Sequence, residues 1–206
     1  TSKNTREKGQ IILDKTGVET GSDLWNDNYS LVGNTFAIRK DSPTGEIVQE
    51  MTTDENGHAE TPKEIANALD LGTYYVTETK ASNGFVNTFK PVKVELKYAS
   101  QTVALVTNNV KGQNQEITGE TTLTKEDKDT GDKTQGKAVF ECAEYTLFTA
   151  KDGKVVKWTE DFKPELVKGT KASDETVTLT LDEKNQVAVK HLAINEYYWQ
   201  ETKAPE

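Results

Sequence analysis

Two lysine and glutamate pairs are the side chains of this sequence whose types and spacing could do chemistry. In the first pair, Lys15 is in phase with Leu13 on one strand-like segment, and Glu78 is in phase with Tyr74 on another. Successive side chains of a strand point to opposite faces, so each charged group is predicted to share the face that its apolar neighbour buries. A lysine and a glutamate should therefore meet in a core.

The second half of the chain repeats this arrangement. Lys125 is in phase with Leu123, and Glu201 is in phase with Trp199. An unpaired buried charge costs several kcal/mol, so two such pairs need an explanation. One explanation is a buried salt bridge, or strand ends at which both side chains reach water, because the lysine stem extends easily to the surface.

Amide formation is the other explanation. A lysine desolvated among apolar side chains has a lowered pKa and becomes a neutral nucleophile, while a buried carboxyl favours its protonated form. The acid would hydrogen-bond the carboxamide oxygen of a neighbouring asparagine, and would then carry the amine proton to the departing ammonia. Groups held in contact in a dry core gain the large effective molarity of an intramolecular reaction.

Strands are the elements that would have to position these groups. Segments rich in β-branched and aromatic residues dominate both halves, and their order repeats. The clearest repeat is YYVTETKA at 74–81 against YYWQETKA at 197–204. One short helix is expected at 62–69, with Thr61 as its cap and Pro62 at its first position. The pattern predicts an all-β protein of two modules.

Composition supports thin β-sandwich cores and narrows the partners. The 206 residues are only 33% hydrophobic and 29% charged, which suits strands that bury one face. The net charge of −9 argues against nucleic acid or an anionic membrane as a partner. Cys142 is the single cysteine, so no intrachain disulfide can form.

Neither a cofactor nor a metal is expected. The acidic segment 127–132 lacks the bidentate glutamate of a full calcium loop, and the sequence contains no phosphate-binding loop. His58 and His191 lie far apart in sequence, in different halves, which makes a shared metal improbable. The chemistry of the chain should therefore reside in the lysine and glutamate pairs.

The same residues carry a resemblance to a known family. A first strand ending in lysine, the box YxxxETKA followed by Ser82-Asn-Gly-Phe85 or by Pro205, and a strand ending Val106-Thr-Asn108 resemble the Cna-B repeat of Gram-positive adhesins and pilins. The resemblance implies two tandem transthyretin-like, inverse immunoglobulin-type β-sandwiches, with a spontaneous lysine–asparagine isopeptide bond. The expected divisions are a tail at 1–8, a first domain at 9–112, a linker at 113–118 and a second domain at 119–206.

Carried over by position, the resemblance makes Lys15 the nucleophile, Glu78 the proton shuttle and Asn108 the acceptor. Strand alternation alone slightly favours Asn109 as the acceptor. In the second domain Lys125 and Glu201 are the counterparts of Lys15 and Glu78. The acceptor asparagine has no counterpart there, because the sequence ends before a strand that could carry it. That domain is expected to lack its last strand, and its open edge could accept a strand from a partner.

The implied role is structural. The modules would form a stalk of a cell-wall-attached, extracellular protein of a Gram-positive bacterium, next to neighbouring domains of the same protein. The isopeptide bond would replace a disulfide, and a turnover enzyme is disfavoured because the reactive groups consume themselves. The alternative is a module that binds a host matrix protein such as collagen, which would require an exposed aromatic or apolar patch.

Overall fold

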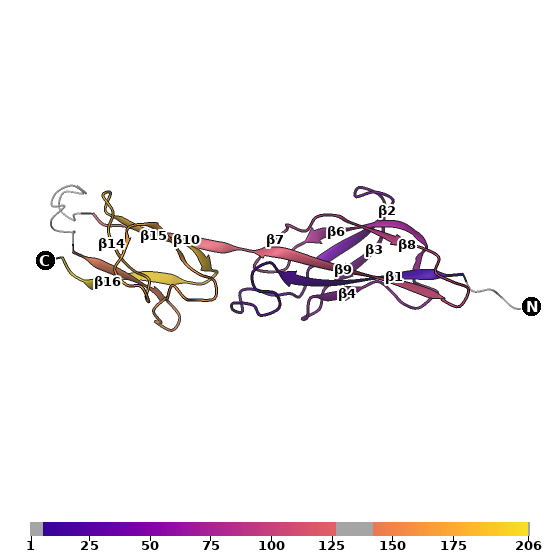
Figure 1. The fold of residues 1–206 in the computed structure, drawn as a ribbon, viewed down its shortest axis with the longest axis horizontal. Helices are drawn as coiled ribbons and strands as arrows, with labels where there is room; N and C mark the ends of the chain where they lie inside the picture. Colours follow the sequence, from indigo (N-terminus) through magenta and orange to yellow (C-terminus); the bar gives the residue numbers. More distant parts are fainter. Residues whose placement is uncertain (1–5, 127–141, 206) are drawn as a thin grey trace, which may run out of the picture. The chain divides into compact units, whose positions relative to one another are not determined.

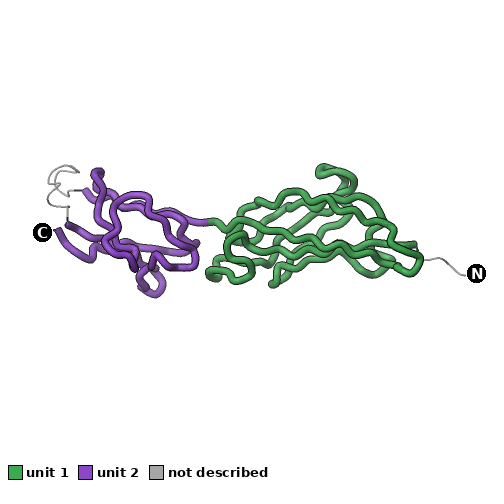
Figure 2. The backbone as a smooth tube through the Cα atoms, in the orientation of Figure 1, with its two compact units in different colours: residues 1–117 green, residues 118–206 purple. Residues whose placement is uncertain are grey.

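The computed structural model describes residues 6–126 and 142–205, and within these ranges the chain forms β-strands and no helix. It divides into two units, Thr1–Ile117 and Thr118–Glu206 (Figure 2). The predicted all-β class is confirmed. The alternation of apolar and polar residues decides the fold, because each strand buries one face.

The first unit is built from two sheets. One has the order β4-β1-β9-β7, with β5 also paired to β1, and the other has the order β3-β2-β6-β8. The strands are β1 (Lys8–Gly17), β2 (Thr35–Lys40), β3 (Ile47–Thr52), β4 (His58–Glu60), β5 (Leu69–Asp70), β6 (Gly72–Lys80), β7 (Phe85–Val86), β8 (Val92–Leu96) and β9 (Leu105–Glu116).

The first and last strands of this unit, β1 and β9, are parallel neighbours (Figure 1). Their register runs from Lys8 opposite Leu105 to Gly17 opposite Asn114. Among the described residues of the unit the other strand pairs are antiparallel, whereas this parallel pairing joins the first strand of the unit to its last. Any group on the inner face of β1 therefore lies beside the inner face of β9.

The core of the first unit lies between the inward faces of its two sheets. Ile11 and Leu13 of β1 and Phe36 and Ile38 of β2 are completely buried, as is Val76 of β6. These positions are separated by two, as the pleat requires. The same alternation brings Lys15 and Glu78 toward this layer.

The second unit also contains two sheets, with orders β10-β15-β12 and β13-β14-β11-β16 among the described residues. Its core includes Tyr145, Leu147 and Leu179. The strands are β10 (Thr118–Thr124), β11 (Glu144–Thr149), β12 (Glu165–Lys168), β13 (Thr170–Lys171), β14 (Thr178–Thr180), β15 (Gln186–Ala193) and β16 (Tyr197–Lys203).

A turn of the same construction precedes β4 in the first unit and β15 in the second, the strands that pair with β1 and β10. In the turns 54–57 and 182–185, Oδ1 of the first aspartate accepts backbone N–H groups two and four residues later, at 2.9 to 3.0 Å. The fourth residue has a positive φ in both turns, 74° and 57°. Its carbonyl accepts the backbone N–H of Lys15 or Lys125, at 2.8 and 2.9 Å.

The prediction of a helix at 62–69 is wrong. The segment makes one hydrogen-bonded turn, in which Ala68 N–H donates to the Glu64 carbonyl at 2.8 Å, before β5 begins. The Thr61 hydroxyl, expected to cap a helix, instead accepts the backbone N–H of Ile11 at 2.9 Å. A helix this short gains too few hydrogen bonds to offset the cost of nucleation.

The segment 113–118 is mostly strand, whereas its polarity predicted a linker. β9 continues to Glu116 and β10 begins at Thr118. Gly112, Asn114 and Glu116 are buried in alternation with exposed or half-buried neighbours. Asn114 and Glu116 therefore face inward and contribute to a polar site, although the polarity of the segment predicts solvation.

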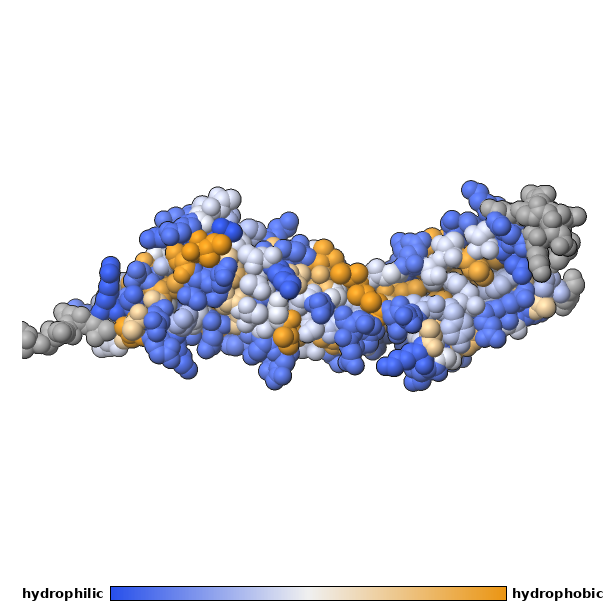
Figure 3. All heavy atoms as spheres, turned by 180° about the vertical axis from the view of Figure 1, so that it is seen from behind, coloured by the Kyte–Doolittle hydropathy of each residue, from blue (hydrophilic) through white to orange (hydrophobic). Residues whose placement is uncertain are grey.

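The face drawn in Figure 3 is predominantly hydrophilic, with smaller hydrophobic areas among the hydrophilic ones. Within the described residues, no helix is both long and apolar enough to span a bilayer. The large hydrophobic side chains that remain exposed come from different strands and loops: Val18, Val32, Ile47, Val48, Val86, Tyr98, Ile117, Leu166, Val167 and Tyr198.

Gly57 is required at the turn that holds Lys15, and substitution by alanine tests this. Gly57 and Gly33 both have positive φ, 74° and 83°, but a Cβ would lie 2.1 Å from the Lys15 carbonyl oxygen at Gly57 and would meet nothing within 4 Å at Gly33. Gly33→Ala should cost about 1 kcal/mol of unfolding free energy through backbone strain, and Gly57→Ala about 2 kcal/mol more through the clash. Denaturant unfolding measures both, and equal losses would contradict the steric argument.

Candidate functional site

Lys15 has no solvent-exposed surface. Its Nζ lies 3.4 Å from the centre of the Phe85 ring and 3.2 Å from Oγ of the buried Ser82. The ring belongs to β7, and Ser82 lies in the turn between β6 and β7. The amine is therefore enclosed by residues that directly follow the YxxxETKA box.

Burial lowers the pKa of Lys15 to about 8, although the negative charges of Glu78 and Glu116 act in the opposite direction. Desolvation outweighs the two carboxylates because it disfavours the charged ammonium directly. At neutral pH roughly one molecule in ten then carries a neutral amine with a free lone pair. Such an amine is a nucleophile, whereas an exposed lysine at this pH is almost wholly protonated.

Glu78 contacts two buried carboxamides near the end of β6. Its Oε2 accepts a hydrogen bond from Asn114 Nδ2 at 2.5 Å and another from Asn34 Nδ2 at 2.7 Å. Both asparagines are completely buried. Asn114 belongs to β9 and pairs with Gly17, two residues after Lys15 in β1. Lysine, glutamate and asparagine are thus brought together by three different strands.

Two atoms of this cluster are left without partners. Glu78 Oε1 and Asn114 Oδ1 are both buried acceptors with no hydrogen bond. A buried acceptor without a donor is costly, and two on one contacting pair suggest a common solution. A proton on Glu78 Oε1 would donate to Asn114 Oδ1 and close a cyclic acid–amide pair with the existing bond from Asn114 Nδ2. That proton would polarise the carbonyl and make the Asn114 Cγ more electrophilic.

The structure does not bring Asn108, or its alternative Asn109, to Lys15. Asn108 pairs with Ile11, and Asn109 pairs with Ile12. The residue opposite Lys15 is Gly112, so Asn108 lies four residues, or about 13 Å, before it along β9. Asn108 is half-buried and Asn109 is exposed. The asparagine of β9 in contact with Glu78 is instead Asn114.

Sequence reasoning missed three polar members of the site: Asn114, Asn34 and Glu116. Glu116 is 3% exposed, and its Oε2 accepts the backbone N–H groups of Glu19 and Thr20 at 2.8 and 3.1 Å. The signal for Asn114 and Glu116 was their shared phase with Val110 on one long strand. No comparable pattern marks Asn34, which lies in the loop before β2.

The counterparts in the second unit are not assembled in the same way. Lys125 is half-buried, and Glu201, expected to face the core, is exposed. Oε1 of Glu201 accepts a hydrogen bond from the Tyr145 hydroxyl at 3.2 Å. Burial, together with the charge and hydrogen bond of Glu201, raises the pKa of Tyr145 to about 12. Among the described residues β16 pairs only with β11, so the outer side of Glu201 is not covered by a further strand.

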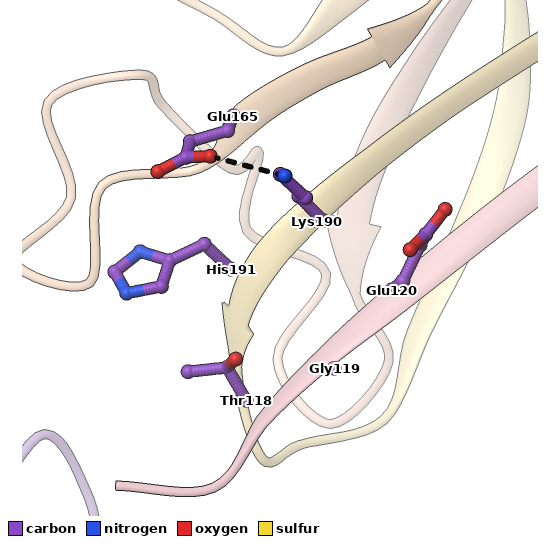
Figure 4. Close-up of a pocket in the computed structure, with 6 residues that line it drawn as sticks. All are labelled: Thr118, Gly119, Glu120, Glu165, Lys190 and His191. Carbon is purple, nitrogen blue, oxygen red and sulfur yellow. Dashed lines mark ion pairs between the residues drawn. The ribbon is translucent and has the colours of Figure 1, made fainter. Parts of the chain in front are cut away.

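A pocket of about 360 Å³ lies in the second unit, between β10, β12 and β15 (Figure 4). Glu165 and Lys190 approach each other across it at 3.7 Å, and both are more than half exposed. Exposed pairs of this kind are screened by water and contribute little. His191 belongs to the same wall, and its Nδ1 lies 3.1 Å from the Lys163 carbonyl oxygen. This pocket lacks a buried reactive group like Lys15.

Metal binding has no candidate within the described residues, where no three histidine, cysteine or acidic side chains form a suitable cluster. His58 lies between Asp14 Oδ1 and Glu60 Oε2, at 2.8 and 3.1 Å. The acidic segment 127–132 lies outside the described residues.

The fold and the cluster define a β-sandwich domain in which a buried lysine, a glutamate and an asparagine converge from the first, sixth and last strands. A sequence profile described as the SpaA prealbumin-like fold domain matches residues 9–111, half of the chain. The chain therefore belongs to this family, and the transthyretin-like sandwich expected from the Cna-B resemblance is confirmed. A search of curated protein sequences found no match.

One solved structure supports the fold over nearly the whole chain, and two pilin structures show a weaker likeness. The Bacillus anthracis TIE protein is 25% identical, with a TM-score of 0.60 over 97% of this chain and 29% of its own. The major pilin subunit BcpA of Bacillus cereus is 17% identical, with a TM-score of 0.43 over 94% of this chain and 57% of its own. A streptococcal ancillary pilin is 19% identical, with a TM-score of 0.39 over 96% of this chain and 54% of its own. The chain spans less than two thirds of the length of each of these three proteins.

The lowered pKa of Lys15 predicts how stability depends on pH when the amine stays unreacted. In Asn114→Ala the lysine is free, and its folded pKa of about 8 lies below the ordinary 10.5. The unfolded chain then binds more protons between these values, so stability should rise with pH from about 8 to 10.5, by roughly 3 kcal/mol.

Denaturant unfolding of Asn114→Ala at several pH values measures this rise, with Asn114→Ala/Lys15→Met as the matched control. The control lacks the titrating amine and should not show the added rise. Parallel pH profiles for the two chains would show that Lys15 is not desolvated.

Proposed function

We propose that the first unit is a structural module that cross-links itself by an isopeptide bond between Lys15 and Asn114, with Glu78 as the proton carrier. The observation that carries the proposal is a fully buried lysine beside a Glu78–Asn114 pair with two unsatisfied acceptor atoms. A salt bridge alone would explain the lysine. It would not explain why the carboxyl contacts a buried carboxamide on the neighbouring strand.

The reaction balances within the three side chains. Neutral Lys15 Nζ attacks Asn114 Cγ while Glu78 donates its proton to the carboxamide, stabilising the tetrahedral intermediate. Glu78 then takes a proton from the attacking nitrogen and delivers it to the leaving nitrogen. As ammonia departs, the carbonyl re-forms and its oxygen returns the first proton to Glu78. One C–N bond forms and one breaks, and Glu78 returns to its initial state. The products are a Lys15–Asn114 amide and ammonia.

The surroundings favour attack over hydrolysis. Phe85 and Ser82 enclose the amine, and Tyr29 packs edge-on against Phe85 with ring centres 6.0 Å apart. The Tyr29 hydroxyl donates to the Ile117 carbonyl at 2.6 Å, so this aromatic cover is tied to the end of β9. Exclusion of water increases the neutral fraction of the amine and holds the reacting groups at a high effective concentration.

The proposed role is that of a stalk module in a pilus or another surface protein of a Gram-positive bacterium. Membership of the SpaA prealbumin-like family supports it, and so does the fold shared with the Bacillus anthracis TIE protein. Its neighbours would be other domains of the same protein, outside the cell. Binding of a host matrix protein has no comparable support, because the exposed hydrophobic side chains are scattered over separate elements.

The second unit is proposed to be a second module of the same fold, in tandem with the first. The matching turns at 54–57 and 182–185 support the repeat, because the last residue of each turn accepts the backbone N–H of a lysine, Lys15 or Lys125. The exposed Glu201 and its contact with Tyr145 do not favour the same reaction there. The proposed chemistry is therefore confined to Lys15, Glu78 and Asn114.

Intact mass under denaturing conditions tests the bond directly. The wild-type chain should be lighter than its sequence by one ammonia, and Lys15→Ala, Glu78→Ala and Asn114→Ala should each restore the plain sequence mass, after allowance for the substitution. Asn108→Ala and Asn109→Ala are the matched controls, and both should keep the deficit. Loss of the deficit in Asn108→Ala, but not in Asn114→Ala, would overturn the assignment of the acceptor.

The bond should also stabilise the first unit. It would close a loop of about 100 residues, which the chain-entropy estimate for cross-links values at about 4–5 kcal/mol. Glu78→Gln preserves the size of the side chain but removes the acid, so it should lower the unfolding free energy by about this amount. The exposed Glu50→Gln is the control. A loss below about 1 kcal/mol would show that no such loop is closed.

A further inference from the structure

Asn34 is held more firmly than an ordinary loop residue. It lies just before β2 and is completely buried. Its backbone N–H donates to Thr53 Oγ1 at 3.0 Å, and its carbonyl accepts from Thr53 N–H at 2.9 Å. Its Nδ2 donates to the Lys80 carbonyl at 2.8 Å and to Glu78 Oε2 at 2.7 Å. The two backbone bonds anchor the residue, and the two bonds from Nδ2 fix the direction in which its side-chain amide points.

That direction determines where a proton can reside on Glu78. Oε2 receives two N–H donors, from Asn34 and Asn114, so a proton placed on Oε2 would face donors and find no acceptor. The proton is therefore directed to Oε1, the buried oxygen that lacks a partner. The acceptor left over in the cluster is Asn114 Oδ1. With Asn34 in place, the acid proton sits where it can polarise the reacting carbonyl.

We propose that Asn34 is a positioning residue for isopeptide formation, which keeps Glu78 Oε2 as the accepting oxygen and so holds the acid proton on Oε1. The inference rests on the proposed cross-linking function. Asn34 acts on the reaction through Glu78, and its Oδ1 also accepts a long hydrogen bond from Asn114 Nδ2 at 3.5 Å. After the reaction its two N–H groups remain available, so it also continues to hold the Glu78 carboxyl in the product.

The second unit supplies an internal comparison. Phe36 pairs with Glu78 in the first unit, and Tyr145 pairs with Glu201 in the second. The residue two positions before Phe36 is Asn34, and the residue two positions before Tyr145 is Ala143, which is also buried. Alanine offers no N–H group from its side chain. The side-chain carboxamide at this position is therefore present in the first unit, where Glu78 contacts the buried Asn114. It is absent in the second unit, where Glu201 is exposed.

A purely structural role for Asn34 is the competing explanation. Its side chain also ties the loop before β2 to the Lys80 carbonyl, and removing it could loosen the enclosure of Lys15. The two roles differ in one observable. A loosened enclosure would hydrate the amine and raise the pKa of Lys15 from about 8 toward 10.5, whereas loss of positioning alone would slow the reaction without changing that pKa.

The experiment follows the loss of ammonia in newly made chains. Wild type, Asn34→Leu, Asn34→Asp and the control Thr53→Val are produced by cell-free synthesis, quenched in denaturant at intervals, and read by intact mass between pH 6 and 9. Resistance to brief proteolysis before quenching shows that each chain has folded. Leucine matches asparagine in size without donors, and aspartate keeps the shape while replacing the donating nitrogen. Thr53→Val weakens the same loop but leaves the Asn34 amide intact.

Both Asn34 variants should lose ammonia at least tenfold more slowly than wild type, with the rise in rate still centred near pH 8. Thr53→Val should stay within about threefold of wild type. The positioning role is overturned if either folded Asn34 variant reacts at the wild-type rate, if Thr53→Val is slowed equally, or if the midpoint of the pH profile shifts upward. Wild-type chain that never loses ammonia would instead overturn the cross-linking function, and the role of Asn34 with it.

Discussion

The burial of the Lys15 amine is the constraint on which the rest of the first unit depends. An ammonium with no exposed surface would be costly, so the surrounding residues must either neutralise it or consume it. Two carboxylates, Glu78 and Glu116, act to keep it charged, yet desolvation still lowers its pKa. The site is therefore poised between an ion pair and a nucleophile. Formation of an amide would remove the unfavourable buried charge permanently.

This constraint explains the unusual inner face of β9. A sandwich strand normally places apolar residues inward, and Val110 does so. Two and four residues further on, however, Gly112 lies opposite Lys15 and Asn114 contacts Glu78. Glu116 then caps the loop after β1 through backbone N–H groups. Asn114 has a partner on β6 and Glu116 has partners in the loop after β1, so most of this polar face is satisfied, and Asn114 Oδ1 is the acceptor that is left over.

The sequence predicted the β class, the repeat of the ETKA box, and the inward phase of Lys15 and Glu78, because these depend on local alternation and short motifs. It did not predict the acceptor. A run of polar residues at 113–118 is typical of a linker, and only the parallel pairing with β1 turns it into part of the site. Asn34 was equally inaccessible, because it acts from a loop with no periodicity. Glu201 differs from Glu78 because its exposure depends on neighbouring strands and not on the motif.

The parallel pairing of β1 and β9 also gives the proposed bond a mechanical meaning. Tension that enters at the start of β1 and leaves at the end of β9 loads their ladder in shear, so its hydrogen bonds are strained together. Lys15 lies near the far end of β1, and Asn114 lies near the exit of β9. A covalent bond between them would carry the force directly across, and residues 16–113 would lie outside the load path. The core of the unit, including the enclosure that made the reaction possible, would then not be required to resist the pull.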